Sequence, residues 1–183
     1  MDSDATEADA EPRVSPMLLA VLSNRVYGGV REMTNTMLRT GRSAVINSAR
    51  DFSCGITTAD NELFATAEGL PAHTYGLNLQ SAAMCEFHDD IAEGDAYLHN
   101  DPYSGASHAP DIGFCVPIFL HDELVGFSMT TAHHLDIGSC EPGSVGIVKC
   151  ADAYAEGIRL RAVRVYENGN PVVPVWQMLR DNV

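Results

Sequence analysis

The sequence predicts an α+β fold in which one long N-terminal helix packs on mixed or antiparallel β-hairpins. The first observation is a run of apolar residues at helical spacing between Met17 and Leu38. The second is a series of short β-rich segments, separated by turn residues, through the rest of the chain. Hydrophobic residues make up 45% of the 183 residues and charged residues 20%, a balance typical of a globular domain.

The N-terminal helix is expected to start after Ser15, an N-cap residue, with Pro16 at the first helical position. Gly41 supplies its end. Residues 1–14 are mostly acidic or small and lack periodicity, so we expect a disordered acidic tail before the folded part, residues 15–183.

Two β-hairpins are expected after the helix. A loop or short strand over 43–49 leads to a strand over 50–57, which pairs with residues 63–67. A short helix over 76–87 and a strand over 96–99 come next. The second hairpin joins 112–120 to 124–131 through a turn at 121–123.

The last part of the chain predicts a half-buried strand over 159–166, a turn at 167–170 and a helix from residue 174. This helix has no closing cap in the sequence. We therefore expect the chain to be an incomplete part of a larger fold.

The charge of the chain argues against two classes of partner. A formal net charge of −14 and a pI of about 4.6 would repel nucleic-acid phosphates and anionic lipid. Lys149 is the only lysine, which fits a halophilic protein in a salt-rich cytoplasm, where screening makes a large negative charge tolerable. A GC-rich genome that favours Arg codons explains the same bias, and both explanations stay open.

The cysteines predict a reducing compartment. Their number is odd and no CxxC pair occurs, and the N-terminus does not look like a signal peptide, so we expect reduced thiols in a cytoplasmic protein. No apolar run reaches the length of a membrane span. Cys140 is the one that could touch a ligand at the site described next, although burial in the core is the alternative. The five are Cys54, Cys85, Cys115, Cys140 and Cys150.

Histidines and aspartates flank the second hairpin. His108 and Asp111 precede its first strand, while His133, His134 and Asp136 follow its second strand. Antiparallel strands of similar length return their outer ends to one place, so His108, Asp111 and either His133 or His134 are expected to meet. Two imidazoles and one carboxylate form a divalent-metal site with open positions. A surface hydrogen bond is the alternative for a His three residues from an Asp.

Seven motifs spread along the chain carry a family resemblance. They are residues 50–54, 67–73, 100–103, 105–111, 132–138, 142–144 and 156–159. They resemble the N-terminal part of the hydantoinase B/5-oxoprolinase family, which includes the large subunits of ATP-dependent acetone and acetophenone carboxylases. The resemblance covers residues 15–183. Family members are several times longer, so the remaining part of the hydantoinase B polypeptide is an expected partner.

The resemblance implies metal ligands at His108, Asp111 and His133, with His134 able to exchange roles with its neighbour. His134 and Asp136 would act beside the metal, and Asp101 is a further candidate catalytic group. Asp101 and His73 are possible proton carriers, with loop hydrogen bonding as the alternative for each. Zinc, manganese and iron all suit such a donor set. The loop over 142–146 could cover the site.

The predicted function is the metal-bearing component of an ATP-dependent hydantoinase or 5-oxoprolinase-type amidohydrolase. The resemblance implies a hydantoinase A-type partner that uses ATP to phosphorylate a cyclic amide, imide or ketone, after which the hydantoinase B component completes the reaction. Two alternatives stay open. The chain could belong to a ketone carboxylase, or it could be a non-catalytic truncated module that binds its partner through the helix between Met17 and Leu38.

Overall fold

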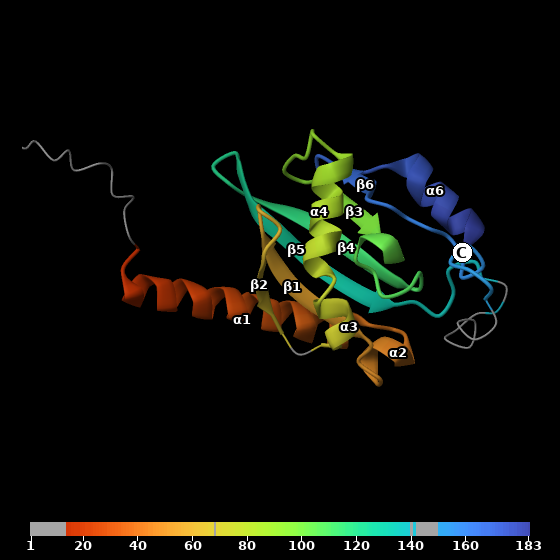
Figure 1. Ribbon diagram of the computed structural model, residues 1–183, viewed down its shortest axis with the longest axis horizontal. Helices are drawn as coiled ribbons and strands as arrows, with labels where there is room; N and C mark the ends of the chain where they lie inside the picture. Colours follow the sequence, from red (N-terminus) through yellow and green to blue (C-terminus); the bar gives the residue numbers. More distant parts are fainter. Residues whose placement is uncertain (1–13, 68, 140, 142–149) are drawn as a thin grey trace, which may run out of the picture.

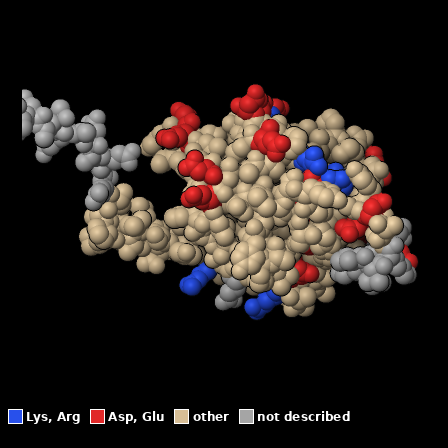
Figure 2. Space-filling model, in the orientation of Figure 1, with Lys and Arg blue, Asp and Glu red and all other residues tan. Residues whose placement is uncertain are grey.

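The computed structural model describes residues 14–67, 69–139, 141 and 150–183 (Figure 1). The predicted tail, Cys140 and the predicted loop over 142–146 lie outside these residues, apart from Val14, and those predictions stay untested. Among the described residues, no helix is long and apolar enough to cross a membrane. Figure 2 shows acidic side chains scattered over one face of the molecule, with fewer basic ones.

Helix α1 (Pro16–Thr40) forms as the sequence predicts. The Ser15 side chain accepts a hydrogen bond from the Leu18 N–H, and the Gly41 N–H donates to the Met37 carbonyl. The second half of α1 packs on the sheet through Val30, whereas the first half extends beyond the sheet (Figure 1). Six large hydrophobic side chains of that first half are exposed: Met17, Leu18, Leu19, Val21, Leu22 and Tyr27.

Within the described residues, seven strands form one antiparallel sheet in the order β2-β1-β5-β4-β3-β6-β7. Both predicted hairpins are confirmed, and β1 and β5 join them into one sheet. The strands are β1 (Phe52–Thr58), β2 (Leu63–Thr66), β3 (Ala96–His99), β4 (Asp111–Leu120), β5 (Glu123–His133), β6 (Val163–Glu167) and β7 (Asn170–Pro171).

The β4–β5 hairpin is the longest strand pair in the sheet, and its register positions Asp111 and His133. Its turn contains His121 and Asp122, both with positive φ, as a tight two-residue hairpin turn requires. The pairing register shifts once, between Ile118 and Phe119. Beyond this shift the strands run in register to the far end of the hairpin, where Asp111 lies directly opposite His133.

Side chains alternate between two covered faces of the sheet. On one face, helix α4 (Leu77–Phe87) buries Leu77 and Met84 against Tyr97, Phe127 and Met129. On the other face, α1 covers β1, while helix α6 (Val173–Asn182) places Leu179 against β3 and β6. Asp111 and His133 share the face of α4, because each alternates with residues that face α1 and α6.

Two segments differ from their predictions. Residues 43–49 contain a one-turn helix, α2 (Ala44–Asn47), because the Ser43 hydroxyl caps it by accepting from the Val45 N–H. Strand β6 starts at Val163 instead of residue 159, because Ala162 has a φ of +48° and the Leu160 and Ala162 N–H groups donate to the side chains of Asn100 and His99. The remaining short elements are α3 (Pro71–Thr74) and the 3₁₀ turn η1 (Pro102–Ser104).

Candidate metal centre

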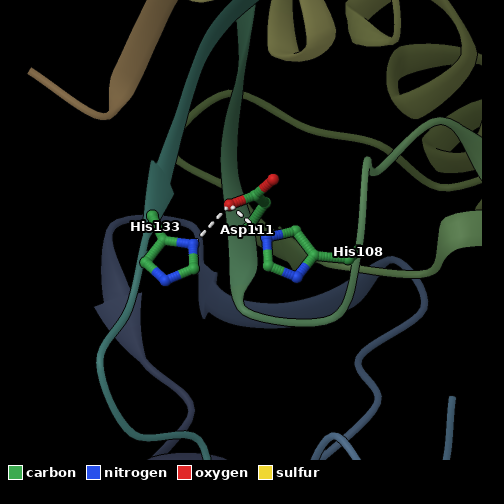
Figure 3. A group of neighbouring side chains, drawn as sticks. All are labelled: His108, Asp111 and His133. Carbon is green, nitrogen blue, oxygen red and sulfur yellow. Dashed lines mark hydrogen bonds and ion pairs between the residues drawn. The ribbon is translucent and has the colours of Figure 1, made fainter. Parts of the chain in front are cut away.

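Asp111 is the first residue of β4 and His133 is the last residue of β5. Their side chains point to the same face, and His133 Nδ1 lies 3.0 Å from Asp111 Oδ1 (Figure 3). The register of the hairpin therefore sets this contact. The expectation that the two ends of the hairpin meet is confirmed.

His108 approaches the same carboxylate oxygen from the loop before β4. Its Nε2 lies 3.2 Å from Asp111 Oδ1, and its ring stacks on that of His133 with centroids 5.1 Å apart (Figure 3). The loop is held at Ala109, whose carbonyl accepts from the Asn100 side chain and whose N–H donates to the Glu156 carboxylate. Two imidazoles thus converge on Asp111 Oδ1.

Gly105 allows the loop to pass close to the start of α4. Its φ of +106° lies in the left-handed region, and an added Cβ would lie 2.5 Å from the Gly76 carbonyl oxygen. A side chain at this position would push the loop away from α4. The glycine before Ser107 and His108 therefore serves the placement of His108.

The second oxygen of Asp111 has its own partners. The Ser107 hydroxyl donates to Asp111 Oδ2 at 2.6 Å, and His73 Nε2 lies 3.0 Å from the same atom. His73 comes from α3, and its Nε2 is also 3.7 Å from an oxygen of Asp51, just before β1. Asp111 is therefore surrounded by three imidazoles and one hydroxyl.

The cluster is largely withdrawn from water. Asp111, His133 and His73 keep only 2–3% of their side-chain surface, while His108 keeps 20% and Asp51 keeps 28%. His108 and Asp51 are thus the exposed members of the cluster.

Electrostatics keep the Asp111 carboxyl ionised. Burial by itself would raise its pKa, but hydrogen bonds from His108, His133 and His73 outweigh burial and hold the pKa far below its usual range. For His108 burial acts in the opposite direction and by itself would lower the pKa. The hydrogen bond to Asp111 and the charges of Asp111 and Glu156 outweigh burial and raise the pKa of His108. The site therefore presents a permanent carboxylate that attracts positive charge.

The donor set fits a divalent cation. Among the described residues, two groups hold donor atoms within 4.8 Å of one another: His108 with Asp111 and His133, and Asp51 with His73 and Asp111. Ligand atoms around a tetrahedral zinc ion lie about 3.3 Å apart, as metal–ligand bonds of about 2.0–2.2 Å require. The measured spacings of 3.0 and 3.2 Å in the first group are close to that value. An ionised oxygen so near two ring nitrogens needs a proton or a cation between each pair of atoms.

The structure places the three predicted catalytic residues outside this cluster. Asp101 is fully buried and lies 2.7 Å from Arg159 and 2.6 Å from Arg161. His134 and Asp136 are exposed and line an apolar groove on the opposite face of the sheet, with Asp136 accepting from the Gly138 N–H. Their catalytic roles stay predictions, as do the ligand roles of His108, Asp111 and His133.

Sequence reasoning missed Asp51 as a member of the cluster and gave His73 no contact with Asp111. Both residues lie in motifs that carried the family resemblance, at 50–54 and 67–73. The sequence alone does not give the register between β1 and β5. This register pairs Phe52 with Ala132 and so brings Asp51 beside His133. The backbone confirms this approach, because the His133 N–H donates to the Asp51 carbonyl at 3.0 Å.

Comparison with known proteins decides the ancestry. The family model described as hydantoinase B/oxoprolinase matches residues 15–183. The chain belongs to the hydantoinase B/oxoprolinase family. Its seven-stranded sheet and flanking helices are therefore a version of the first part of that family's fold.

Two relatives in the hydantoinase B/oxoprolinase family are bacterial proteins. The chain is 38% identical over 179 residues to the hydantoinase B component of a putative D-/L-hydantoinase of Pseudomonas sp. strain NS671, covering 93% of this chain and 30% of the relative. It is 33% identical over 171 residues to the caprolactamase subunit beta of Pseudomonas jessenii, covering 93% and 29%. The chain thus spans about 30% of the length of these relatives.

Solved structures agree with this assignment. The crystal structure of the ATP-dependent caprolactamase from Pseudomonas jessenii matches with a TM-score of 0.81 and 32% identity, over 94% of this chain and 30% of that one. A nucleotide-free acetone carboxylase structure matches with a TM-score of 0.79 but only 21% identity, over 91% and 22%. The latter likeness shows a shared fold.

Proposed function

We propose that this chain is the metal-bearing part of an ATP-dependent enzyme that opens cyclic amides or imides. The observation that carries the proposal is the convergence of His108, Asp111 and His133 at one end of the β4–β5 hairpin. The relatives named for hydantoin and caprolactam support the substrate class.

A divalent cation at the site, zinc, manganese or iron, would supply Lewis acidity to a carbonyl oxygen or to water. The two imidazoles would hold it as neutral ligands, and the Asp111 carboxylate would offset part of its charge. Because His108 is the most exposed of the three, substrate would approach from its side.

The use of ATP follows from the poor leaving group of an amide. A hydantoinase A-type partner would transfer the γ-phosphoryl group to the amide oxygen. Water then adds to the carbonyl carbon, and the ring C–N bond breaks as the nitrogen takes a proton, which leaves an acyl phosphate. A second water converts the acyl phosphate into the carboxylate and free phosphate. Asp101, His134 and Asp136 stay candidate catalytic groups, although none of them lies in the Asp111 cluster of the described residues.

Ketone carboxylation is the alternative chemistry. The acetone carboxylase likeness supports it through the fold alone, because identity is only 21%. The caprolactamase subunit, at 33% identity, favours the amide. We therefore place amide ring opening first.

Two surfaces support the proposal that the chain works with other polypeptide. One is a groove of about 600 Å³ between α1 and α6, lined by apolar side chains of β4 and β5 such as Ile112 and Phe114. The other is the exposed apolar first half of α1. We propose that these surfaces bind the remaining part of a hydantoinase B polypeptide and the ATP-using partner. We also propose a cytoplasmic location, in keeping with the buried thiols of Cys54 and Cys115.

Metal analysis of the purified chain tests the site. After dialysis, we expect one equivalent of zinc, manganese or iron in the native protein and almost none in His108→Ala or His133→Ala. His121→Asn is the matched control, because His121 is exposed at the other end of the same hairpin and Asn tolerates its positive φ. Metal content that is the same in all four proteins would remove the site.

Reconstitution separates the enzyme from a non-catalytic binding module. The chain, the rest of a related hydantoinase B polypeptide and an ATPase partner should together hydrolyse a lactam with ATP, and Asp111→Ala should abolish turnover while co-purification persists. Co-purification without turnover in the native complex would favour the binding module.

A further inference from the structure

The two oxygens of Asp111 are in different environments. Oδ1 faces the ring nitrogens of His108 and His133, the proposed metal ligands. Oδ2 faces the Ser107 hydroxyl at 2.6 Å and His73 Nε2 at 3.0 Å. One oxygen therefore points toward the proposed cation, and the other is occupied by two donors of the protein.

We propose that His73 and Ser107 form a clamp on Asp111 Oδ2, so that Asp111 offers only Oδ1 and binds the cation as a monodentate ligand. In this role His73 is a positioning residue and not a metal ligand. The inference rests on the proposed metal centre and adds how that centre is held in shape. Residues that orient metal ligands commonly change metal affinity by roughly 10- to 100-fold.

The position of His73 is built into the start of α3. The Leu70 carbonyl accepts from the His73 N–H and also from the hydroxyls of Thr74 and Ser53. Because Ser53 belongs to β1, these hydrogen bonds tie the one-turn helix to the sheet. The His73 ring is 2% exposed, so its place above Asp111 is fixed by packing as well.

The contact with Asp111 determines which ring nitrogen of His73 carries a proton. An ionised carboxylate only accepts hydrogen bonds, so the His73 proton lies on Nε2. His73 Nδ1 is buried and has no hydrogen-bond partner among the described residues. A buried ring nitrogen without a hydrogen-bond partner lowers the free energy of unfolding. This cost accompanies the placement of the Nε2 donor at Asp111 Oδ2.

A second metal ion shared by Asp51, His73 and Asp111 is the competing arrangement, since their donor atoms also lie within 4.8 Å. Charge argues against it. Two carboxylates balance one divalent cation, whereas two such cations would leave excess positive charge beside largely buried side chains. Asp111 Oδ2 would also have to exchange its short hydrogen bond from Ser107 for the second ion.

The test uses the full chain with Zn²⁺ or Co²⁺ as the probe. Three variants are compared with the native protein: His73→Leu, which removes the donor, His73→Gln, which keeps an N–H near Nε2, and Ser107→Ala. His121→Asn serves again as the control. Metal stoichiometry is measured by elemental analysis, affinity by competition with a chelator, and coordination number by the visible absorption of bound Co²⁺.

We expect one equivalent of metal in every protein. Affinity should fall roughly 10- to 100-fold in His73→Leu and in Ser107→Ala, and recover toward the native value in His73→Gln. The Co²⁺ absorption should weaken in His73→Leu, because a released Oδ2 raises the coordination number. If His73→Leu does not fold, the Ser107→Ala and His73→Gln proteins still decide the matter.

Three results would overturn the clamp. Two equivalents in the native protein and one in His73→Leu would make His73 a ligand. Native affinity and spectrum in both His73→Leu and Ser107→Ala would show that Oδ2 needs no clamp, and would leave the metal centre intact. Absence of metal from the native protein would remove the clamp together with the proposed function.

Discussion

Asp101 and Asp111 are two buried carboxylates on one stretch of chain, and they have opposite kinds of partner. Asp101 is bound by the guanidinium groups of Arg159 and Arg161 and by the Tyr103 N–H. Asp111 is bound by the imidazoles of His108, His133 and His73. Both have a lowered pKa, because these hydrogen bonds outweigh the effect of burial.

The two clusters differ in whether the partners of the carboxylate can lose a proton. A guanidinium group is always charged, so the negative charge of Asp101 is already balanced and its oxygens are occupied. An imidazole can give up its proton and present a lone pair instead. We therefore expect Asp101 to stabilise the fold, and we propose that a cation replaces the imidazole protons that face Asp111.

The largest expected effect comes from breaking the first of these clusters. Asp101→Asn should lower the free energy of unfolding by about 3 kcal/mol, because it weakens the charge-assisted hydrogen bonds from Arg159 and Arg161 to a fully buried side chain. Urea unfolding measures this. Asp122→Asn is the matched control, since Asp122 is exposed in the β4–β5 turn and Asn suits its positive φ. Equal stability of the two variants would contradict a structural role for Asp101.

A metal-dependent difference should come next in size. At a free Zn²⁺ concentration about 100 times the dissociation constant, binding should stabilise the native protein by about 2.7 kcal/mol. Asp111→Asn should lose this gain, while Asp101→Asn should keep it on a lower baseline. Thermal unfolding with and without Zn²⁺ provides the measurement. If Zn²⁺ stabilised Asp111→Asn but not Asp101→Asn, the result would contradict metal binding at Asp111.

The smallest effect is a pH dependence at Asp101. Its pKa is lowered on folding, so its contribution to stability is complete above the unfolded pKa of about 3.9 and is lost as the pH falls through the folded pKa. The stability difference between the native protein and Asp101→Asn should stay constant between about pH 7 and 5 and shrink below about pH 4. Unfolding midpoints across this range test the sign, and a difference that grew on acidification would be incompatible with it.

Local patterns predicted most of the elements. The Ser15-Pro16 start and the Gly41 end gave α1 to within a residue, and the two hairpins followed from their turns. The meeting of Asp111 and His133 followed as well, because hairpin geometry is local. The alternating pattern over 159–166 predicts a strand from residue 159, but it does not reveal the positive φ of Ala162 or the hydrogen bonds from the Leu160 and Ala162 N–H groups to side chains.

Contacts between distant segments were beyond such reasoning. The β1–β5 pairing and the position of α3 are set by packing across the whole sheet, and they bring Asp51 and His73 to the site. The face of a side chain was equally hard to foresee next to a strand end. His133 and His134 are adjacent, yet the first joins the Asp111 cluster and the second lines the groove on the other face.

The register shift between Ile118 and Phe119 separates the tip of the β4–β5 hairpin from its base. An extra residue is already absorbed there, so a change in length near His121 and Asp122 need not slide the strands at the other end. The tip is therefore the natural place to attach a fluorophore or an affinity tag without disturbing the cluster around Asp111.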